Sequence, residues 1–284
     1  MGIGSLGSLR CVSDSWFKPV TVEEMYGDWD YDAAVATLDR SLSPRSSASI
    51  LDVVGSLGVG PGDVVLDIGG REGQYALSIV ERFGCRAISV DPGRDNNERG
   101  RELVAAHEYG HLVELRLGSI EQIPAEDGSC QLVFARDILG HIEDLALAMT
   151  ECRRVLSPGG FMAIFGVFAT PMLYPEEERR LCADAATVPE RLSVANFETT
   201  VAAIGFSVES LDILGSEHVE ASQEAGTTPN YLLQVSRLRR AKESLLEELG
   251  EVPYRVMYAN ALWSIYRMIG KLESRIYVLR RDGN

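Results

Sequence analysis

Residues 64 to 73 read VVLDIGGREG, an apolar run with an acid near its end, followed by a glycine-rich turn. Apolar and β-branched residues are typical of a parallel strand that helices cover on both faces. Glycine tolerates a positive φ and has no Cβ, so a turn built from it lets another molecule approach the main chain. The stretch therefore predicts a buried strand that ends in a ligand-binding turn.

The spacing of the glycines distinguishes between nucleotide-binding folds. A nicotinamide or flavin fingerprint requires G-x-G-x-x-G after the strand, whereas residues 67–73 read DIGGREG. A second acid, Asp91, follows the apolar stretch 86–90. A carboxylate at a strand end can accept hydrogen bonds from two ribose hydroxyls, a device that NAD enzymes also use. A ligand containing a nucleoside is therefore expected, and these two motifs leave its class open.

The rest of the chain alternates short apolar runs with stretches of helical periodicity, which is the pattern of a parallel sheet. The expected strands are 63–68, 86–90, 112–117, 132–135, 161–168, 206–214 and 274–280. The expected helices are 30–40, 46–57, 72–83, 95–108, 143–156, 175–186 and 195–204. Thr228-Pro229 and Val252-Pro253 indicate the starts of two long helices before the last strand, because proline is tolerated in a first helical turn.

A third motif separates the families. Residues 153–160 read RRVLSPGG between an amphipathic helix and an apolar strand. This stretch resembles the R-V-L-x-P-G-G turn of the class I S-adenosylmethionine-dependent methyltransferases, which dehydrogenases do not share. The first motif of that family, an acid and then G-x-G-x-G, resembles residues 67–73, with Arg71 in the place of the middle glycine. Over residues 62–168 the chain is most similar to ubiquinone/menaquinone-type and natural-product small-molecule members.

The resemblance implies an α/β architecture with a Rossmann-like, seven-stranded, mostly parallel sheet whose last strand is antiparallel. Residues 61–214 and 272–284 would form the methyltransferase core. Residues 1–60 would form a helical N-terminal segment. Residues 215–271 would form a helical cap or substrate region, inserted between the last two strands.

The resemblance also implies S-adenosyl-L-methionine as the cofactor. It further implies which residues of this chain bind that cofactor. The expected residues are Asp67, Gly69, Gly70, Arg71, Gly73, Asp91, Pro92, Ser119, Ile120 and Arg136. Ser119 departs from the family, which usually has an acid beside the adenine, although a serine can still hydrogen-bond an amino group. Arg71 either points outward with its backbone lining the turn or holds the carboxylate of the cofactor.

Three residues are catalytic candidates, each as the group that removes a proton from the acceptor. His141 ends the segment 135–141, ARDILGH, which resembles the place where methyl donor and acceptor meet in the family. Glu217 and His218 follow the expected strand 206–214. Imidazole and carboxylate can both accept protons, but helix capping and a solvated acidic surface explain the same residues. A base is often unnecessary, because proximity and orientation do most of the work in methyl transfer.

The composition restricts the partners. The chain has 284 residues, 45% of them hydrophobic, and a formal net charge of −15. Phosphate backbones are bound by basic surfaces, so this charge argues against a nucleic-acid partner. The five cysteines show no C-x-x-C spacing, and no metal site is expected. No apolar run approaches the roughly 18 residues of a membrane span, so a cytoplasmic protein without membrane contact is expected.

The resemblance implies an S-adenosylmethionine-dependent methyltransferase that acts on an apolar or aromatic small molecule in bacterial secondary metabolism. Two alternatives remain open. One is an enzyme of this fold repurposed for a cyclisation or rearrangement, and the other is a non-catalytic partner protein that binds the cofactor. The sequence names neither the acceptor nor the methylated atom, and it does not decide whether the chain forms a homodimer.

Overall fold

The structure, a computed structural model, describes residues 19–27 and 29–283. The chain divides into two compact units, residues 1–42 and 43–284. The described part of the first unit contains α1 (Val22–Met25) and α2 (Tyr31–Leu38), neither of which buries a side chain. Asp30 caps α2 by accepting a hydrogen bond from the Ala33 amide. Cys11 lies outside the described residues.

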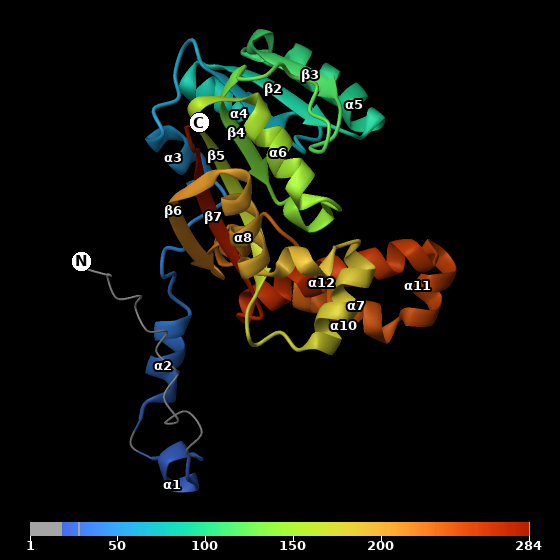
Figure 1. The fold of residues 1–284 in the computed structure, drawn as a ribbon. Helices are drawn as coiled ribbons and strands as arrows, with labels where there is room; N and C mark the ends of the chain where they lie inside the picture. The colour runs from blue at the N-terminus through green and yellow to red at the C-terminus, as the bar shows by residue number, and fades with distance from the viewer. Residues whose placement is uncertain (1–18, 28, 284) are drawn as a thin grey trace, which may run out of the picture. The chain divides into compact units, whose positions relative to one another are not determined.

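The second unit is built on a sheet that has seven strands within the described residues, in the order β3-β2-β1-β4-β5-β7-β6 (Figure 1). Strand β7 is antiparallel to both β5 and β6, and the other neighbouring strands pair in parallel. The expected mostly parallel sheet with an antiparallel last strand is thus confirmed. The strands are β1 (Val64–Ile68), β2 (Arg86–Asp91), β3 (Val113–Leu117), β4 (Cys130–Arg136), β5 (Leu156–Ala169), β6 (Phe206–Gly215) and β7 (Leu272–Arg281).

Helices cover both faces of this sheet (Figure 1). Side chains alternate along each strand, so that Leu66 joins the core under one set of helices and Val65 joins the core under the other. The first core includes residues of α6 (Leu145–Val155) and α8 (Val194–Ile204). The second core includes residues of α3 (Ser49–Ser56), α4 (Gln74–Phe83), α7 (Pro175–Ala185) and α12 (Glu251–Met268). Helix α5 (Arg94–Ala106) connects β2 with the short helix η2 (Gly110–Leu112).

The strand order locates the ligand crevice. From β1 the chain proceeds outward to β2 and β3, and then it returns to the other side of β1 to form β4. The order therefore reverses between β1 and β4, and in open α/β sheets ligands bind at the carboxyl ends of the strands at such a point. The turn at residues 69–73 follows β1 at this place.

Strand β5 begins earlier than its sequence indicates. Residues 157–160, SPGG, read as a turn before a strand at 161, but β5 begins at Leu156. Leu156 pairs with Cys130 and Phe161 pairs with Leu132, so four residues are accommodated in an irregularity between these pairs. Gly159 takes a positive φ of 76° there. The turn is thus retained as a bulge inside a longer strand.

A helical insertion separates β6 from β7, as expected. It consists of α9 (Glu217–Glu224), α10 (Tyr231–Arg240), α11 (Lys242–Leu249) and α12, all within the described residues. The expectation of two long helices differs from this arrangement, because Ala241 and Gly250 end helices that the periodicity alone would continue. Gly250, at a φ of 85°, forms the junction between α11 and α12.

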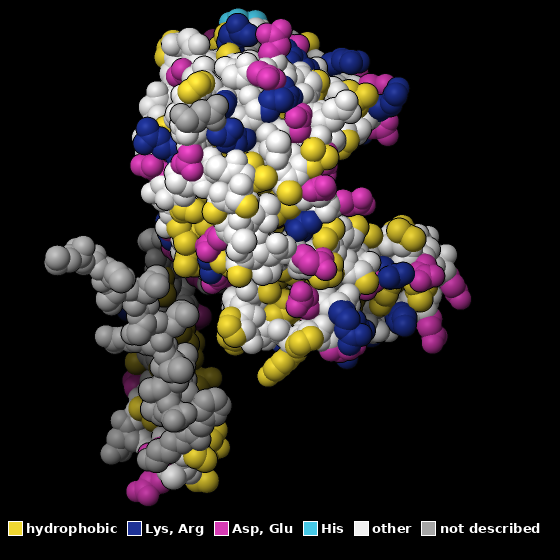
Figure 2. Space-filling view, viewed as in Figure 1, with side chains coloured by type: hydrophobic (Ala, Val, Ile, Leu, Met, Phe, Trp, Pro, Cys, Tyr) yellow, Lys and Arg dark blue, Asp and Glu magenta, His cyan; other side chains and the backbone are white. Residues whose placement is uncertain are grey.

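Acidic and basic side chains are interspersed on the face of residues 43–284 that Figure 2 shows. Apolar side chains lie between them as small groups. Within the residues that the structure describes, no helix combines the length and the apolar character that crossing a bilayer requires.

Candidate active site

The turn after β1 brings its main chain into very close contact with its neighbours. The Gly69 amide donates to the Val90 carbonyl at 2.8 Å, and Gly69 has a φ of 72°. A Cβ at Gly69 would lie 2.4 Å from a methyl carbon of Ile138, and a Cβ at Gly70 would lie 2.0 Å from the Ser89 hydroxyl. Only glycine fits at these two positions, because any side chain would collide with these neighbours.

Arg71 contributes its backbone to this turn. Its amide donates to Asp91 Oδ2 at 3.0 Å, which ties the turn after β1 to the end of β2. The Arg71 side chain is exposed, and the residue has a φ of 51°, in the left-handed region that glycine prefers. This backbone contact agrees with an Arg71 main chain that lines the turn, and the role of the exposed side chain stays a prediction.

Asp91 organises the neighbouring loop. Its side chain is buried, and Oδ1 accepts hydrogen bonds from the Gly93 amide at 2.8 Å and from Asn96 Nδ2 at 2.9 Å. A carboxylate offers about four acceptor positions. The three hydrogen bonds from the described residues therefore leave one position, on Oδ2, for a ligand hydroxyl.

A cavity of about 460 Å³ lies at the switch point of the sheet. This volume is within the usual range for small-molecule sites, about 300 to 1,000 Å³. The cavity gathers most of the expected cofactor residues with one catalytic candidate. Its lining includes Gly69, Arg71, Asp91, Pro92, Ser119, Ile120, Arg136 and His141.

Three expected cofactor residues lie beside this cavity and do not line it. Asp67 is buried under the turn and accepts a hydrogen bond from the Ser89 hydroxyl at 3.2 Å. Burial raises the pKa of Asp67 to about 7, despite that hydrogen bond. Gly70 lies directly above this carboxylate, and Gly73 precedes α4 as its N-cap residue with a φ of 84°. Asp67 thus lies beneath the turn, and Gly70 and Gly73 are part of it.

The cavity also contains residues that the sequence analysis did not single out. Glu121 lines it two positions after Ser119, so an acid is present near the place where the family usually has one. An inspection of the residues around Ser119 could have found it. Ile138, Ile142 and Asp137 complete the apolar and polar walls. Asp137 has a φ of 57°, which no sequence pattern indicated.

His141 lies at the boundary between two cavities. It ends the short helix η3 (Leu139–His141) and is exposed. A second cavity, of about 130 Å³, shares Asp137 and His141 with the first and adds Thr187, Asn260 and Trp263 among its lining residues. Nδ1 of His141 lies 3.0 Å from the Ala186 carbonyl. Because a carbonyl can only accept, Nδ1 carries the proton in this hydrogen bond, and Nε2 of the neutral ring is left as an acceptor.

The other two catalytic candidates lie outside both cavities. Glu217 accepts hydrogen bonds from Arg45 at 2.9 Å (Nε) and 2.6 Å (Nη2), and this contact lowers the pKa of Glu217. His218 is half-buried, and its ring lies 5.3 Å from the ring of Phe165. Burial, together with the charges of Arg267 and Arg136, lowers the pKa of His218 to about 4.

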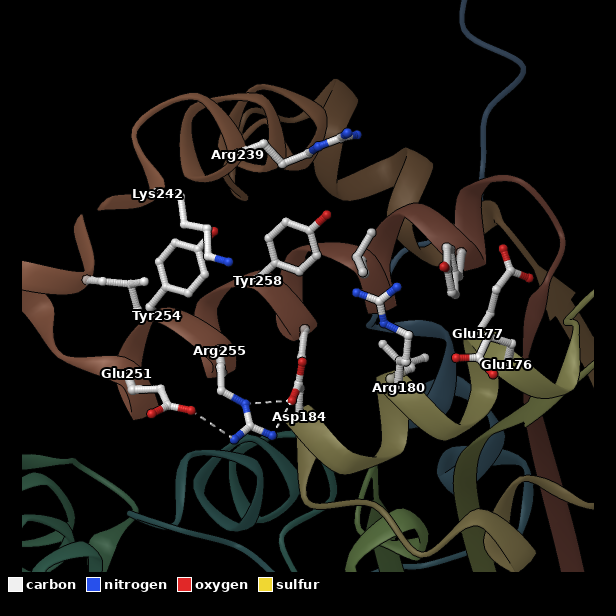
Figure 3. A pocket seen from close by; sticks show the side chains of 15 residues that line it. Glu176, Glu177, Arg180, Asp184, Arg239, Lys242, Glu251, Tyr254, Arg255 and Tyr258 are labelled. Carbon is white, nitrogen blue, oxygen red and sulfur yellow. Dashed lines mark hydrogen bonds and ion pairs between the residues drawn. The ribbon is translucent and has the colours of Figure 1, made fainter. Parts of the chain in front are cut away.

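A further cavity, of about 940 Å³, lies between α7 and helices α10 to α12. Figure 3 shows that charged side chains project into it from both sides. Arg255 of α12 bonds there to Asp184 of α7 at 2.6 Å. Tyr254, Tyr258 and Leu262 of α12 are among its lining residues. None of the expected site residues lines this cavity.

Comparisons with known proteins give a consistent family. A family described as "Methyltransferase domain" matches residues 66–164. A glycine/sarcosine/dimethylglycine N-methyltransferase from Actinopolyspora halophila is 24% identical over 80% of this chain. A sarcosine/dimethylglycine N-methyltransferase from Halorhodospira halochloris is 26% identical over 72% of the chain. The matched part spans 38% of the first relative and 69% of the second.

Solved structures share the fold. A putative sarcosine dimethylglycine methyltransferase from Galdieria sulphuraria superposes with a TM-score of 0.64 at 18% identity, covering 82% of this chain and 84% of its own. The [4+2]-cyclase SpnF superposes with a TM-score of 0.66 at 16% identity, covering 86% of each chain. Residues 66–164 of the chain thus match a methyltransferase domain, and the relatives and the cavity at the sheet switch point agree with the class I S-adenosylmethionine-dependent methyltransferases that the sequence resembles.

Proposed function

We propose that this protein transfers a methyl group from S-adenosylmethionine to a small-molecule acceptor. The observation that supports this most is the 460 Å³ cavity at the switch point, whose walls combine the glycine turn, Asp91 and His141. Such a site presents main-chain groups and one carboxylate to a nucleoside and keeps a proton acceptor at its edge.

The residues of the cavity suit the parts of the cofactor. The Gly69 turn allows close approach of the main chain, and the free position on Asp91 Oδ2 accepts a ribose hydroxyl. Ile120 and Ile142 offer apolar surface to the adenine, whose amino group can donate to Ser119 or Glu121. When bound, S-adenosylmethionine supplies an electrophilic methyl group, which passes to an oxygen, nitrogen or carbon nucleophile as the sulfur becomes a neutral thioether.

We place the acceptor in the second cavity, which adjoins the first through Asp137 and His141. His141 can take the acceptor proton on Nε2, because the Ala186 carbonyl holds the proton of the ring on Nδ1. We prefer His141 as the base, because Glu217 is paired with Arg45 and His218 packs against Phe165 outside both cavities. A role of Glu217 or His218 as the base stays a prediction. Asn260 and Trp263 of α12 reach this cavity, so we assign residues 215–271 as the cap that selects the acceptor.

The acceptor class is the finer part of the proposal. Leu139, Val167 and Trp263 line the second cavity and favour an acceptor with an apolar or aromatic body. Relatives are named for acceptors as different as sarcosine, malonyl-[acyl-carrier protein] and sterols. This breadth is compatible with a role in bacterial secondary metabolism, where acceptors are diverse.

Calorimetric titration with S-adenosylhomocysteine, the demethylated product, tests the donor site. We expect wild-type protein to bind it and Asp91→Asn to bind it at least tenfold more weakly, since a hydrogen bond to a charged group contributes about 1.5–3 kcal/mol. Asp95→Asn, an exposed change four residues along the chain, is the control and should bind as wild type does. Absence of binding by the wild type would refute the proposal.

Incubation of a mixture of candidate acceptors with a labelled methyl donor tests the reaction itself. With an accepted substrate, His141→Gln should lower kcat by about 10² or more if His141 removes a proton. Equal rates would leave orientation alone as the catalytic contribution of this residue. The same assay separates the repurposed alternative, because a cyclisation or rearrangement would consume substrate without accumulating S-adenosylhomocysteine. The likeness to the cyclase extends to the fold alone.

A further inference from the structure

Three buried side-chain nitrogen atoms lack a hydrogen-bond partner within residues 19–27 and 29–283. They are Nε of Arg136, Nε2 of His218 and Nη2 of Arg267. Their residues come from β4, α9 and α12, which are far apart in the sequence. Buried nitrogen atoms of this kind are normally paired. That all three belong to one neighbourhood calls for a common explanation.

The ring of Phe165, in β5, lies at the centre of this neighbourhood. The guanidinium carbons of Arg136 and Arg267 each lie 5.7 Å from its centroid. The ring of His218 lies 5.3 Å from it. We refer to Arg136, His218 and Arg267 as the Phe165 cluster.

The cluster carries positive charge that the described residues do not neutralise by contact. Arg267 is 6% exposed, and its guanidinium donates from Nε to the Ser274 hydroxyl at 3.0 Å. Arg136 stacks on Tyr75 at 4.8 Å and forms no ion pair among the described residues. Asp137 exerts an attractive charge on Arg267, but it is exposed and makes no ion pair with it. A buried, unpaired guanidinium is unfavourable unless an anion accompanies it.

His218 completes the cluster as a neutral donor. Burial and the two neighbouring guanidinium groups lower its pKa to about 4, so the imidazole is uncharged near neutral pH. An N–H at Nε2 would then offer a hydrogen bond without adding charge. Two cations and one neutral donor around an aromatic ring form a suitable environment for one oxyanion with several acceptor positions.

We propose that the Phe165 cluster binds a carboxylate or phosphate group of the methyl acceptor. Arg136 connects the cluster with the donor cavity, because it also lines that cavity. An acceptor anchored by its anion would therefore extend its apolar body toward the transferred methyl group. This inference rests on the proposed function and adds an anionic group to the acceptor. The carboxylate of the donor is the other source of the same chemistry, and the experiment separates the two.

The test titrates protein saturated with S-adenosylhomocysteine with three probes of similar shape: benzoate, phenyl phosphate and neutral benzamide. Wild-type protein should bind at least one anion tenfold or more tightly than benzamide. Arg267→Met should remove this preference and change the affinity for S-adenosylhomocysteine less than threefold. Arg275→Met is the matched control. Arg275 also lies over an aromatic ring, Phe168, but it is paired with Glu273, so this variant should retain the preference.

A second variant keeps the inference testable if Arg267→Met does not fold. His218→Phe keeps an aromatic ring beside Phe165 and removes the neutral donor, and it should weaken anion binding threefold to tenfold. A wild type that binds benzamide as well as both anions would overturn the inference. Loss of S-adenosylhomocysteine binding in Arg267→Met, with anion binding unchanged, would assign the cluster to the donor and would equally overturn it. If wild type does not bind S-adenosylhomocysteine, the proposed function fails, and the same titration without it still tests the cluster.

Discussion

Arg71 combines an unfavourable backbone conformation with an exposed side chain. Its φ of 51° costs an L-residue about 1–2 kcal/mol, which glycine avoids at a smaller entropic cost. We therefore expect Arg71→Gly to raise the free energy of unfolding by about 0.5–1 kcal/mol in urea denaturation. Affinity for S-adenosylhomocysteine should change less than threefold, because the amide that bonds to Asp91 remains. A tenfold loss would show instead that the side chain holds the donor.

Asp67 makes the stability of the protein depend on pH. Burial raises the pKa of its carboxyl to about 7 in the folded protein, above its ordinary value near 4. The folded state holds this proton more tightly, so the stabilisation is complete below pH 4 and disappears as the pH rises through 7. Between pH 5 and pH 8, the free energy of unfolding of the wild type should fall by about 2–3 kcal/mol relative to that of Asp67→Asn. Urea denaturation of both proteins at several pH values measures this, and parallel curves would contradict it.

At the residue scale, the sequence predicts positions whose chemistry is local. Gly69 follows β1 directly and Asp91 is the last residue of β2, so their place at the sheet edge is a consequence of chain order. Arg267 could not be found in this way, because its burial beside Phe165 depends on how α12 packs against β5. Asp137 was missed for a similar reason: its amide, one residue after β4, donates to the Phe165 carbonyl of β5 at 2.9 Å, a contact between segments that are distant in the sequence.

Helix α9 is held by an ion-pair cluster that involves a distant part of the chain. Arg45 contacts Glu217 at the start of α9 and Asp212 in β6, at 2.6 and 2.5 Å. The Arg45 side chain is 41% exposed, so its pairs contribute only about 1 kcal/mol to stability. Arg45→Met should nevertheless speed hydrogen exchange of the α9 amides, because a local anchor is lost.

Arg82→Met provides the control for this change. Arg82 forms a comparable exposed ion pair with Asp52 at 2.6 Å, remote in sequence from α9. Its loss should leave the exchange of α9 unchanged. If both variants accelerate exchange in α9 equally, the effect is a general loss of stability and not the loss of an anchor.

At the element scale, hydrophobic periodicity predicted the strands and the helices of the core to within a few residues. Periodicity did not predict the element bounds that depend on contacts between distant parts of the chain. The start of β5 depends on the pairing of Leu156 with Cys130, which the turn-like residues 157–160 conceal. In the insertion, residues 242–249 form a separate helix, and the junctions at Ala241 and Gly250 carry no strong periodic signal.

At the scale of the whole molecule, both hydrophobic cores are formed by residues from Ile50 onward. A protein of residues 43–284 should therefore fold, with a thermal midpoint within about 3 °C of the full chain. A protein of residues 61–284 lacks Ile50 and Val54, which are 1% and 0% exposed. Its free energy of unfolding should be lower than that of residues 43–284 by about 4 kcal/mol or more. Circular dichroism melts compare the two. Equal midpoints would place the boundary of the folded unit at 60, where the sequence analysis put it.

Asp137 and His141 each form part of the wall of both cavities at the sheet edge. A ligand that shifts either side chain in one cavity changes the shape offered to the ligand in the other. Such thermodynamic coupling is reciprocal: whatever factor the donor imposes on acceptor affinity, the acceptor imposes on donor affinity. The two substrates would then bind non-independently, and initial-rate kinetics would show a Michaelis constant for each that depends on the concentration of the other.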